Sequence, residues 1–321
     1  MGISPCLESA RSTSALFSRV SRNAERVIMP INERALRKQD VSPAFYCVHD
    51  ITGGALSEFA QLASHLDRTT RFFGIQAPAS LMPDPDFAGS IKAIAAHYAE
   101  VLQEFQPEGP LFLGGFCAGA IIALEIAQRL QASRRNIALL VAIDAVPENT
   151  CAELRPWHPH YVLSLMRNVP GWFKHGGLIR EKDSHSLPRR CWNNVIAIGK
   201  AVLGRQHNQS LHGGYSIAGL MNLARYSPVQ RQFINRLYSA CFDYAPKPYS
   251  GNVVVYEANV KPLFHLPQLA SRWHGFAPQA EVVAITGTHL SMMRDPYVDQ
   301  MARDLQQRIA VLTSEQPRRA N

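Results

Sequence analysis

A cysteine between two glycines is the feature of this sequence that most directly suggests a reactive group. Gly115, Cys117 and Gly119 form a G-x-C-x-G turn, which follows a short apolar run and precedes apolar residues at helical spacing. In a strand–turn–helix of this kind the central side chain is exposed at the tip, and the first helix amides point toward negative charge beside it. These amides also favour the thiolate, the form of cysteine that attacks a carbonyl. Small residues equally allow close packing around a buried, inert cysteine, so the turn alone leaves both interpretations open.

Two acidic residues follow apolar runs that are typical of buried parallel strands. Asp144 comes directly after residues 136–143, and Glu257 comes directly after residues 252–256. Functional groups gather at the carboxyl ends of the strands in open α/β sheets, where an acid can orient a histidine. Asp144 is the preferred acid and Glu257 the second candidate, and an aspartate that merely caps the next turn is the structural alternative.

His289 is the candidate base. It lies in a short glycine-containing loop between an apolar strand pattern at 281–285 and a helical pattern at 298–312. A histidine in such a loop can reach across the end of the sheet toward the nucleophile. His97, by contrast, lies within the helical pattern 91–105 and is assigned to helix packing or to the surface. The chain order cysteine, acid, histidine is the order found in α/β-hydrolases.

Stabilisation of the negative charge that forms during attack requires two amide donors. Ala118, the residue after the cysteine, is positioned to supply one of them. The glycine-rich loop 50–54 follows another strand pattern, and we expect Ile51 to supply the other. This loop lacks the lysine-containing pattern of a nucleotide phosphate site, so no cofactor is expected there.

The elements that position these residues alternate between strand and helix. Strand patterns cover 45–49, 71–76, 136–143, 252–256 and 281–285, and helical patterns cover 91–105 and 298–312. The alternation predicts an α/β protein with the α/β-hydrolase fold, a mostly parallel sheet flanked by helices.

The alternation breaks in the middle of the chain. Residues 147–249 are helical, aromatic and basic in pattern and predict a helical lid inserted between core segments 27–146 and 250–314. An ordinary packed subdomain is the alternative interpretation of this insertion. Residues 1–26 and 315–321 are expected to be a flexible extension and a flexible tail.

Composition restricts the classes of partner. The formal charge is +8, and twelve Lys and Arg against three Asp and Glu lie between Cys151 and Ala240. A basic surface attracts acidic molecules, but the absence of long Lys/Arg runs argues against nucleic acid. No apolar run is long enough to span a membrane, and residues 1–26 lack the pattern of a secretory signal. The six cysteines are scattered without zinc-ligand spacing, which predicts no metal site and reduced thiols in the cytoplasm.

With these residues in place, the chain resembles the thioesterase domains of nonribosomal peptide and polyketide synthetases over about residues 27–312. The motifs that carry the resemblance are I-M-P-I-N, F-Y-C-V-H-D-I-T-G-G, F-G-I-Q-A, the cysteine turn, L-L-V-A-I-D-A, N-V-P-G-W and V-V-A-I-T-G-T-H-L-S-M-M. The resemblance implies that Cys117 is the nucleophile, Asp144 the acid and His289 the base. It also implies a small acyl substrate carried on the phosphopantetheine of an acyl or peptidyl carrier protein.

The cysteine departs from the serine that is usual in this family. A thioester acyl-enzyme keeps the transfer potential of its carrier-bound substrate, whereas an oxoester loses part of it. Cysteine is compatible with hydrolysis, and it also suits transfer to another acceptor. We expect a thioesterase that releases its acyl group by hydrolysis, with an acyltransferase or cyclase using an amine or hydroxyl acceptor as the alternative. A catalytically silent scaffold of the same fold is the second alternative, and Arg189 and Arg190 are candidates for a carrier-docking face.

Overall fold

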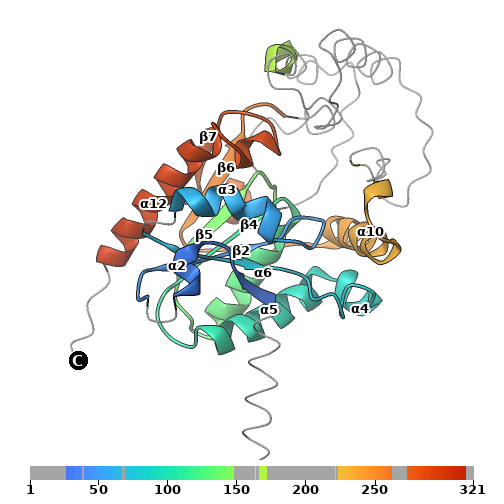
Figure 1. Cartoon of the computed structure of the whole chain (residues 1–321), viewed down its shortest axis with the longest axis horizontal. Coiled ribbons are helices and arrows are strands. Elements are labelled where there is room, and N and C mark those ends of the chain that lie inside the picture. The colour runs from blue at the N-terminus through green and yellow to red at the C-terminus, as the bar shows by residue number, and fades with distance from the viewer. Residues whose placement is uncertain are drawn as a thin grey trace, which may run out of the picture.

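The computed structural model describes residues 27–37, 40–66, 69–147, 163, 166–171, 221, 223–261 and 273–315. These residues form a seven-stranded sheet with helices on both faces (Figure 1). In spatial order the strands are β1 (Ile28–Pro30), β3 (Arg71–Ile75), β2 (Ala44–Val48), β4 (Leu111–Phe116), β5 (Ile137–Ile143), β6 (Val253–Ala258) and β7 (Glu281–Ile285). Only the β1–β3 pair among these strands is antiparallel, so the sheet is mostly parallel, as predicted.

Alternate side chains of the central strands enter two separate cores. Tyr46 and Val48 of β2 belong to the core on one face, and Phe45 and Cys47 belong to the core on the other. Both faces are therefore apolar and covered, which explains why the central strands read as continuous apolar runs in the sequence.

One face is covered by α3 (Leu56–Leu66) and α12 (Val298–Ser314), which pack against each other. The opposite face is covered by α4 (Pro85–Ala88), α5 (Ile91–Phe105), α6 (Ala118–Ala132) and α10 (Pro228–Asp243). The remaining short elements are α2 (Glu33–Leu36), α11 (Trp273–Phe276) and the 3-10 turns η1 (Leu223–Arg225) and η3 (Ser291–Met293). Within the described ranges, no helix is both long and apolar enough to cross a membrane.

Most of the expected lid, 147–249, lies outside the described residues, as do residues 1–26, 316–321 and the arginines at 189 and 190. The two longest described parts of this segment are residues 166–171 and 223–249. Residues 166–171 are helical. Helix α10 begins with a capping box, in which the Ser227 hydroxyl accepts from the Gln230 amide and the Gln230 side chain accepts from the Ser227 amide. Its buried side chains, including Phe233 and Leu237, join the core on the α5 and α6 face.

Candidate active site

Cys117 occupies the turn between β4 and α6. Its backbone has φ 56° and ψ −124°, a conformation that a residue with a side chain rarely adopts. The Cys117 amide donates to the Ile143 carbonyl at 3.0 Å, which ties the turn to the end of β5. The side chain is partly exposed, whereas Cys47 and Cys241 are buried. The sharp turn therefore presents a thiol at the carboxyl end of the sheet.

The two glycines of the turn allow strand and helix to approach each other at backbone contact distance. A Cβ atom on Gly115 would lie 2.1 Å from the Gly119 carbonyl oxygen, and one on Gly119 would lie 2.1 Å from the His49 carbonyl oxygen. Both neighbours are backbone atoms that cannot rotate away. The glycine spacing seen in the sequence is therefore a steric requirement of this turn.

His289 and Asp144 lie next to each other at the same end of the sheet. His289 Nδ1 donates to Asp144 Oδ2 at 2.7 Å, and the imidazole stacks on the Phe116 ring with centroids 4.6 Å apart. The Cys117 side chain is close enough to His289 for its charge to act on the imidazole. Because Nδ1 carries the proton shared with the carboxylate, Nε2 is the nitrogen available to act as a base toward the thiol.

The charges around His289 favour its protonated form. Burial alone would lower the pKa of His289, but the Cys117 thiolate charge, the hydrogen bonds to Asp144 and Cys117, and the Asp144 charge raise it well above its ordinary value. Such an environment stabilises an imidazolium once the thiol proton has been transferred.

Asp144 follows β5 with φ 43°, and its side chain is only 6% exposed. Burial alone would raise its pKa, but the Lys261 charge first, and then His289 and the Ala258 amide, hold the pKa of this carboxyl well below its usual range. Asp144 Oδ1 accepts from the Ala258 amide at 2.9 Å and from Lys261 Nζ at 3.2 Å. The carboxylate is thus ionised, and both of its oxygens are engaged.

Glu257, the second candidate acid, contacts Lys261, the same cation that contacts Asp144. Its Oε2 lies 3.6 Å from Lys261 Nζ. Lys261, which lies three residues beyond the end of β6, was not predicted as part of the site. Its spacing of four residues from Glu257 indicates pairing only on a helix, and Glu257 lies in a strand.

The two amides expected to stabilise negative charge lie in the two loops at the ends of β4 and β2. Ala118 is the first residue of α6, and Ile51 lies in the loop after β2, whose end pairs with the end of β4. Within the described part of the chain, neither amide donates a hydrogen bond to another group. Both N–H groups are therefore available to an oxyanion beside Cys117, a role that remains a prediction.

A buried histidine holds the loop that contains Ile51. His49 Nδ1 donates to the Asp50 carbonyl at 2.5 Å, and His49 Nε2 accepts from the Tyr98 hydroxyl at 2.8 Å. Burial lowers the pKa of His49 to about 4, so the ring is neutral near pH 7. Because a trans peptide is planar, fixing the Asp50 carbonyl also fixes the Ile51 N–H in the opposite direction. This support could not be predicted from the sequence, since His49 and Tyr98 are far apart in the chain.

Asp50 is a further acidic residue at this end of the sheet. Its Oδ1 accepts from the Thr52 amide at 2.8 Å and from the Thr52 hydroxyl at 2.5 Å. Burial raises the pKa of Asp50, although the Thr52 hydrogen bonds and the His289 charge oppose that effect. The carboxyl therefore closes the loop around Ile51 and lies within electrostatic range of the candidate base.

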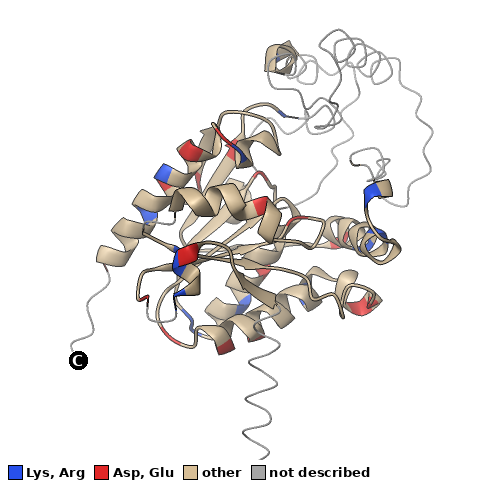
Figure 2. Ribbon diagram, in the orientation of Figure 1, with Lys and Arg blue, Asp and Glu red and all other residues tan. Residues whose placement is uncertain are grey.

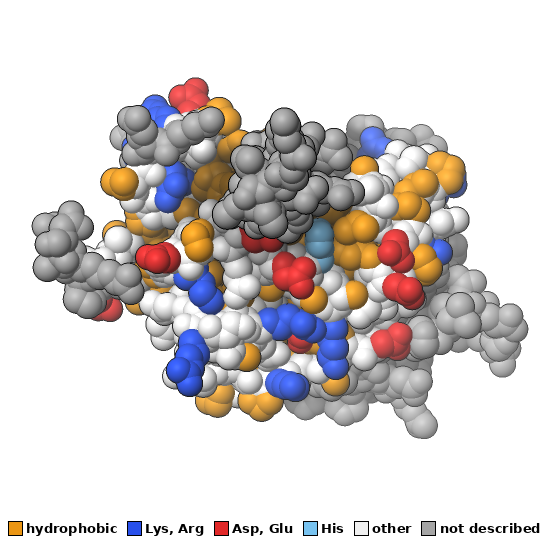
Figure 3. All heavy atoms as spheres, turned by 90° about the horizontal axis from the view of Figure 1, so that it is seen from below, with side chains coloured by type: hydrophobic (Ala, Val, Ile, Leu, Met, Phe, Trp, Pro, Cys, Tyr) orange, Lys and Arg blue, Asp and Glu red, His pale blue; other side chains and the backbone are white. Residues whose placement is uncertain are grey.

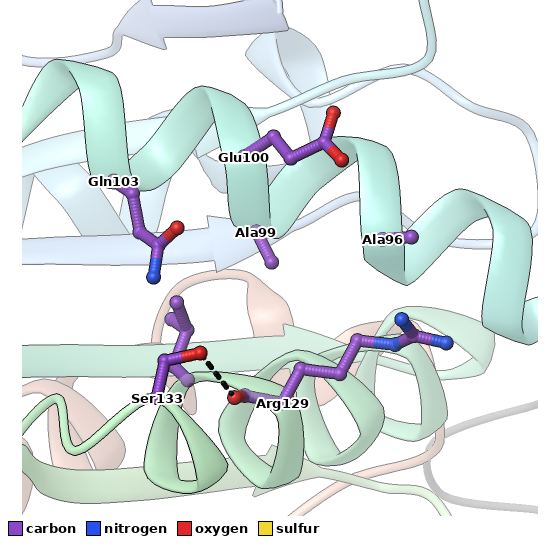
Figure 4. Close-up of a pocket in the computed structure, with 7 residues that line it drawn as sticks. Ala96, Ala99, Glu100, Gln103, Arg129 and Ser133 are labelled. Atoms are coloured by element: carbon purple, nitrogen blue, oxygen red, sulfur yellow. Dashed lines mark hydrogen bonds between the residues drawn. The ribbon is translucent and has the colours of Figure 1, made fainter.

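A small cavity of about 150 Å³ lies elsewhere, between α5 and α6 (Figure 4). Gln103 of α5 and Ser133 at the end of α6 face each other across it, and the Ser133 hydroxyl donates to the Arg129 carbonyl at 3.3 Å. None of its lining residues belongs to the predicted site. Among the described residues no cluster of three or more His, Cys, Asp or Glu side chains has the arrangement of a metal site.

Comparison with known proteins finds a family whose model matches part of the chain. Residues 43–171 match the family model of the thioesterase domain. Enterobactin synthase component F of Escherichia coli (strain K12) is 34% identical over 108 residues, which are 34% of this chain and 8% of that protein. The non-reducing polyketide synthase rdc1 of Metacordyceps chlamydosporia is 34% identical over 121 residues, 36% of this chain and 6% of that protein. The chain spans between 1% and 8% of the length of such relatives.

Solved structures confirm the fold. The NocB thioesterase domain, in covalent complex with a fluorophosphonate nocardicin G analogue, has a TM-score of 0.55 and 18% identity, covering 88% of this chain and 99% of that one. The surfactin thioesterase domain SrfTE has a TM-score of 0.52 and 15% identity, covering 92% of this chain and 98% of that one. The predicted α/β-hydrolase fold and the resemblance to thioesterase domains of nonribosomal peptide and polyketide synthetases are thus confirmed.

Proposed function

From the thioesterase-domain match over residues 43–171, we propose that this protein is an acyl-transfer enzyme with Cys117 as its nucleophile. It accepts an acyl or peptidyl group from the phosphopantetheine of a carrier protein and releases that group by hydrolysis. The observation that carries this proposal is the 2.7 Å hydrogen bond between His289 Nδ1 and Asp144 Oδ2, at the end of the sheet where the turn presents the Cys117 thiol. No cofactor is required, and the reaction takes place in the cytoplasm, where the thiols remain reduced.

The proposed reaction has two halves. His289 Nε2 takes the Cys117 proton while the sulfur attacks the thioester carbonyl, and the oxyanion is received by the Ala118 and Ile51 amides. Collapse of this intermediate breaks the carbon–sulfur bond to pantetheine, whose thiolate takes the proton from His289. In the second half His289 takes a proton from water, the hydroxyl attacks the acyl-enzyme, and the Cys117 sulfur leaves and is reprotonated.

The cysteine also supports a transferase or cyclase. Exchange of one thioester for another leaves the acyl group almost as activated as it was on the carrier, so an amine or hydroxyl can replace water in the second half. The residues expected to cover the site, 147–249, would then form a lid that excludes water. Hydrolysis remains our first proposal, and transfer to an acceptor is the alternative that the cysteine favours.

Intact-protein mass spectrometry tests the nucleophile. The wild type is mixed with an acyl-pantetheine thioester and quenched, beside Cys117→Ala and Cys117→Ser. We expect an added acyl mass on the wild type and on Cys117→Ser, and none on Cys117→Ala. Cys241→Ala is the matched control, because this second thiol is buried with a pKa raised by burial, and it should acylate like the wild type.

The fate of the acyl-enzyme separates the alternatives. Faster loss of the acyl mass with an amine than in water alone, with amide as product, would identify a transferase, and loss to free acid would identify a hydrolase. If no thioester gives either an acyl mass or free acid, the catalytically silent scaffold is the better description.

A further inference from the structure

Lys261 is a cation placed against both acidic side chains at this end of the sheet. Its Nζ lies 3.2 Å from Asp144 Oδ1 and 3.6 Å from Glu257 Oε2. The Lys261 side chain is 24% exposed and that of Asp144 only 6%. Charges withdrawn from water are screened less than surface charges, so this contact is a strong electrostatic influence on Asp144.

The two oxygens of Asp144 are divided between two tasks. Oδ1 accepts from Lys261 Nζ and from the Ala258 amide, and Oδ2 accepts from His289 Nδ1. A carboxylate with both oxygens occupied has a fixed rotation about its side-chain bond. Part of its negative charge is balanced by Lys261, and the remainder acts on the imidazole.

The backbone of Lys261 is held from the opposite side. Its amide donates to Asn168 Oδ1 at 2.7 Å, and Asn168 is 8% exposed. A Cβ atom on Gly171 would lie 2.6 Å from Val260 Cγ2, so residues 166–171 lie directly against this end of β6. The position of the ammonium group is therefore defined by packing as well as by its ion pairs.

We propose that Lys261 is a positioning residue for His289: it fixes the Asp144 carboxylate and shares its charge, so that the imidazole holds its proton less tightly than Asp144 alone would dictate. The inference rests on the proposed roles of Cys117 and His289. It assigns a function to Lys261, which does not itself contact the reacting atoms.

The charged groups around His289 and Asp144 determine the sign of the expected effect. Cys117, Asp144 and Asp50 interact with His289 directly, whereas Lys261 contacts Asp144 and Glu257 contacts Lys261. Lys261 is the cation of this group within the described residues. Its removal leaves the surroundings more negative, so both the imidazole and the thiolate should bind protons more tightly.

The test is the pH dependence of Cys117 alkylation by iodoacetamide, followed by intact mass. Lys261→Met should raise the midpoint of the alkylation curve by about 0.5–1 pH unit. Lys261→Arg keeps the charge and should leave the midpoint near that of the wild type. Glu257→Gln should move the midpoint in the opposite direction, because the Lys261 charge then acts on Asp144 alone. Circular dichroism checks that each variant is folded.

A purely structural role for Lys261 makes a different prediction. Lys261→Met would then slow alkylation equally at every pH without moving the midpoint, and that result would overturn the proposal. If Lys261→Met does not fold, the alkylation midpoint of Glu257→Gln is the test, since an unchanged midpoint in that variant would also overturn the proposal. The proposed function fails separately: no thioester would then acylate Cys117, whatever the alkylation midpoints.

Discussion

At the scale of single residues, Gly119 is a position that has no room for a side chain. A Cβ atom there would lie 2.1 Å from the His49 carbonyl oxygen and 2.4 Å from that of Val48, and both are backbone atoms of the adjacent strand end. We expect Gly119→Ala to lower the free energy of unfolding by about 3 kcal/mol or more, because helix α6 must move to relieve the overlap. Urea unfolding followed by circular dichroism measures the change.

The matched control for this substitution is Gly275→Ala in α11. A Cβ atom on Gly275 has nothing within 4 Å, so the same chemical change should be nearly neutral. Equal losses of stability in the two variants would contradict the steric account of the cysteine turn.

His49 makes the stability of the folded chain depend on pH. Burial lowers its pKa from 6.5 in an open environment to about 4 in the folded chain. Between these values the unfolded chain binds a proton that the folded chain does not, so stability is complete above pH 6.5 and falls as the pH is lowered toward 4. The loss attributable to this histidine is about 3 kcal/mol at its full extent.

His49→Asn isolates this contribution. The asparagine amide can occupy the place of Nδ1 and donate to the Asp50 carbonyl, but it cannot be protonated. Between about pH 4 and 6.5, we expect the free energy of unfolding to depend more steeply on pH in the wild type than in His49→Asn. The difference in slope corresponds to at most one proton taken up on unfolding. Parallel slopes for the two proteins would show that His49 is not the titrating group.

At the scale of elements, α6 is joined to the end of α10 through a buried carboxylate. The Tyr244 hydroxyl donates to Glu125 Oε2 at 2.8 Å, and Arg129 Nε donates to Glu125 Oε1 at 2.8 Å. Tyr244→Phe would leave one buried charged oxygen without this donor, which should cost about 1–3 kcal/mol of stability.

Tyr249→Phe is the counterpart for this prediction. The Tyr249 hydroxyl is buried and has no hydrogen-bond partner among the described residues. Its removal should therefore be neutral or slightly stabilising, as measured by denaturant unfolding under the same conditions. Similar losses of stability in the two phenylalanine variants would contradict a specific contribution from the Tyr244–Glu125 hydrogen bond, because both substitutions keep the ring.

Elements with a strong apolar pattern were predicted well from the sequence. The strand expected at 281–285 and the helix at 91–105 have those bounds in the structure, and the strand expected at 136–143 begins one residue later. The helix is buried along one face and the strand 137–143 on both, so their hydrophobic pattern is set by the packing itself. The strand 281–285 lies at the edge of the sheet, and only Ile285 in it is buried. The pattern expected at 252–256 continues to Ala258, because Glu257 pairs with Ala284 of β7 rather than ending the strand.

Contacts between distant side chains were not visible in the sequence. Lys261 meets Asp144 across 117 positions, and Tyr98 meets His49 across 49, and neither pair has a local spacing that marks it. His289 and Asp144 were paired in the prediction because each follows a strand, and parallel strands bring their carboxyl ends together. The buried polar groups that support this pair could not be predicted in the same way, because strand order does not determine them.

At the scale of the whole molecule, charge is unevenly distributed along the chain. Acidic and basic side chains are interspersed over the described elements, as Figure 2 shows on the ribbon and Figure 3 on one surface. Asp and Glu slightly outnumber Lys and Arg in this part of the chain, so the positive excess lies in the remaining residues. This supports our proposal that the basic segment between Cys151 and Ala240 receives an acidic carrier protein.

Salt and charge reversal test the carrier proposal. We expect kcat/KM with an acyl carrier protein to fall several-fold as ionic strength rises from about 0.05 to 0.5 M, because screening slows the encounter of opposite charges. Arg189→Glu combined with Arg190→Glu should lower this value and flatten its salt response. An uncharged small acyl thioester is the control, since its turnover should change in neither case. A carrier reaction that is indifferent to both changes would remove this segment from the docking face.

The backbone at Cys117, with its φ of 56°, also bears on how the protein can change over generations. A glycine there would adopt the same turn without strain, so drift under selection for stability alone would favour loss of the thiol. Cys117→Gly should accordingly be at least as resistant to urea as the wild type. The strained backbone at this cysteine is what the proposed catalytic role of its thiol would require selection to maintain.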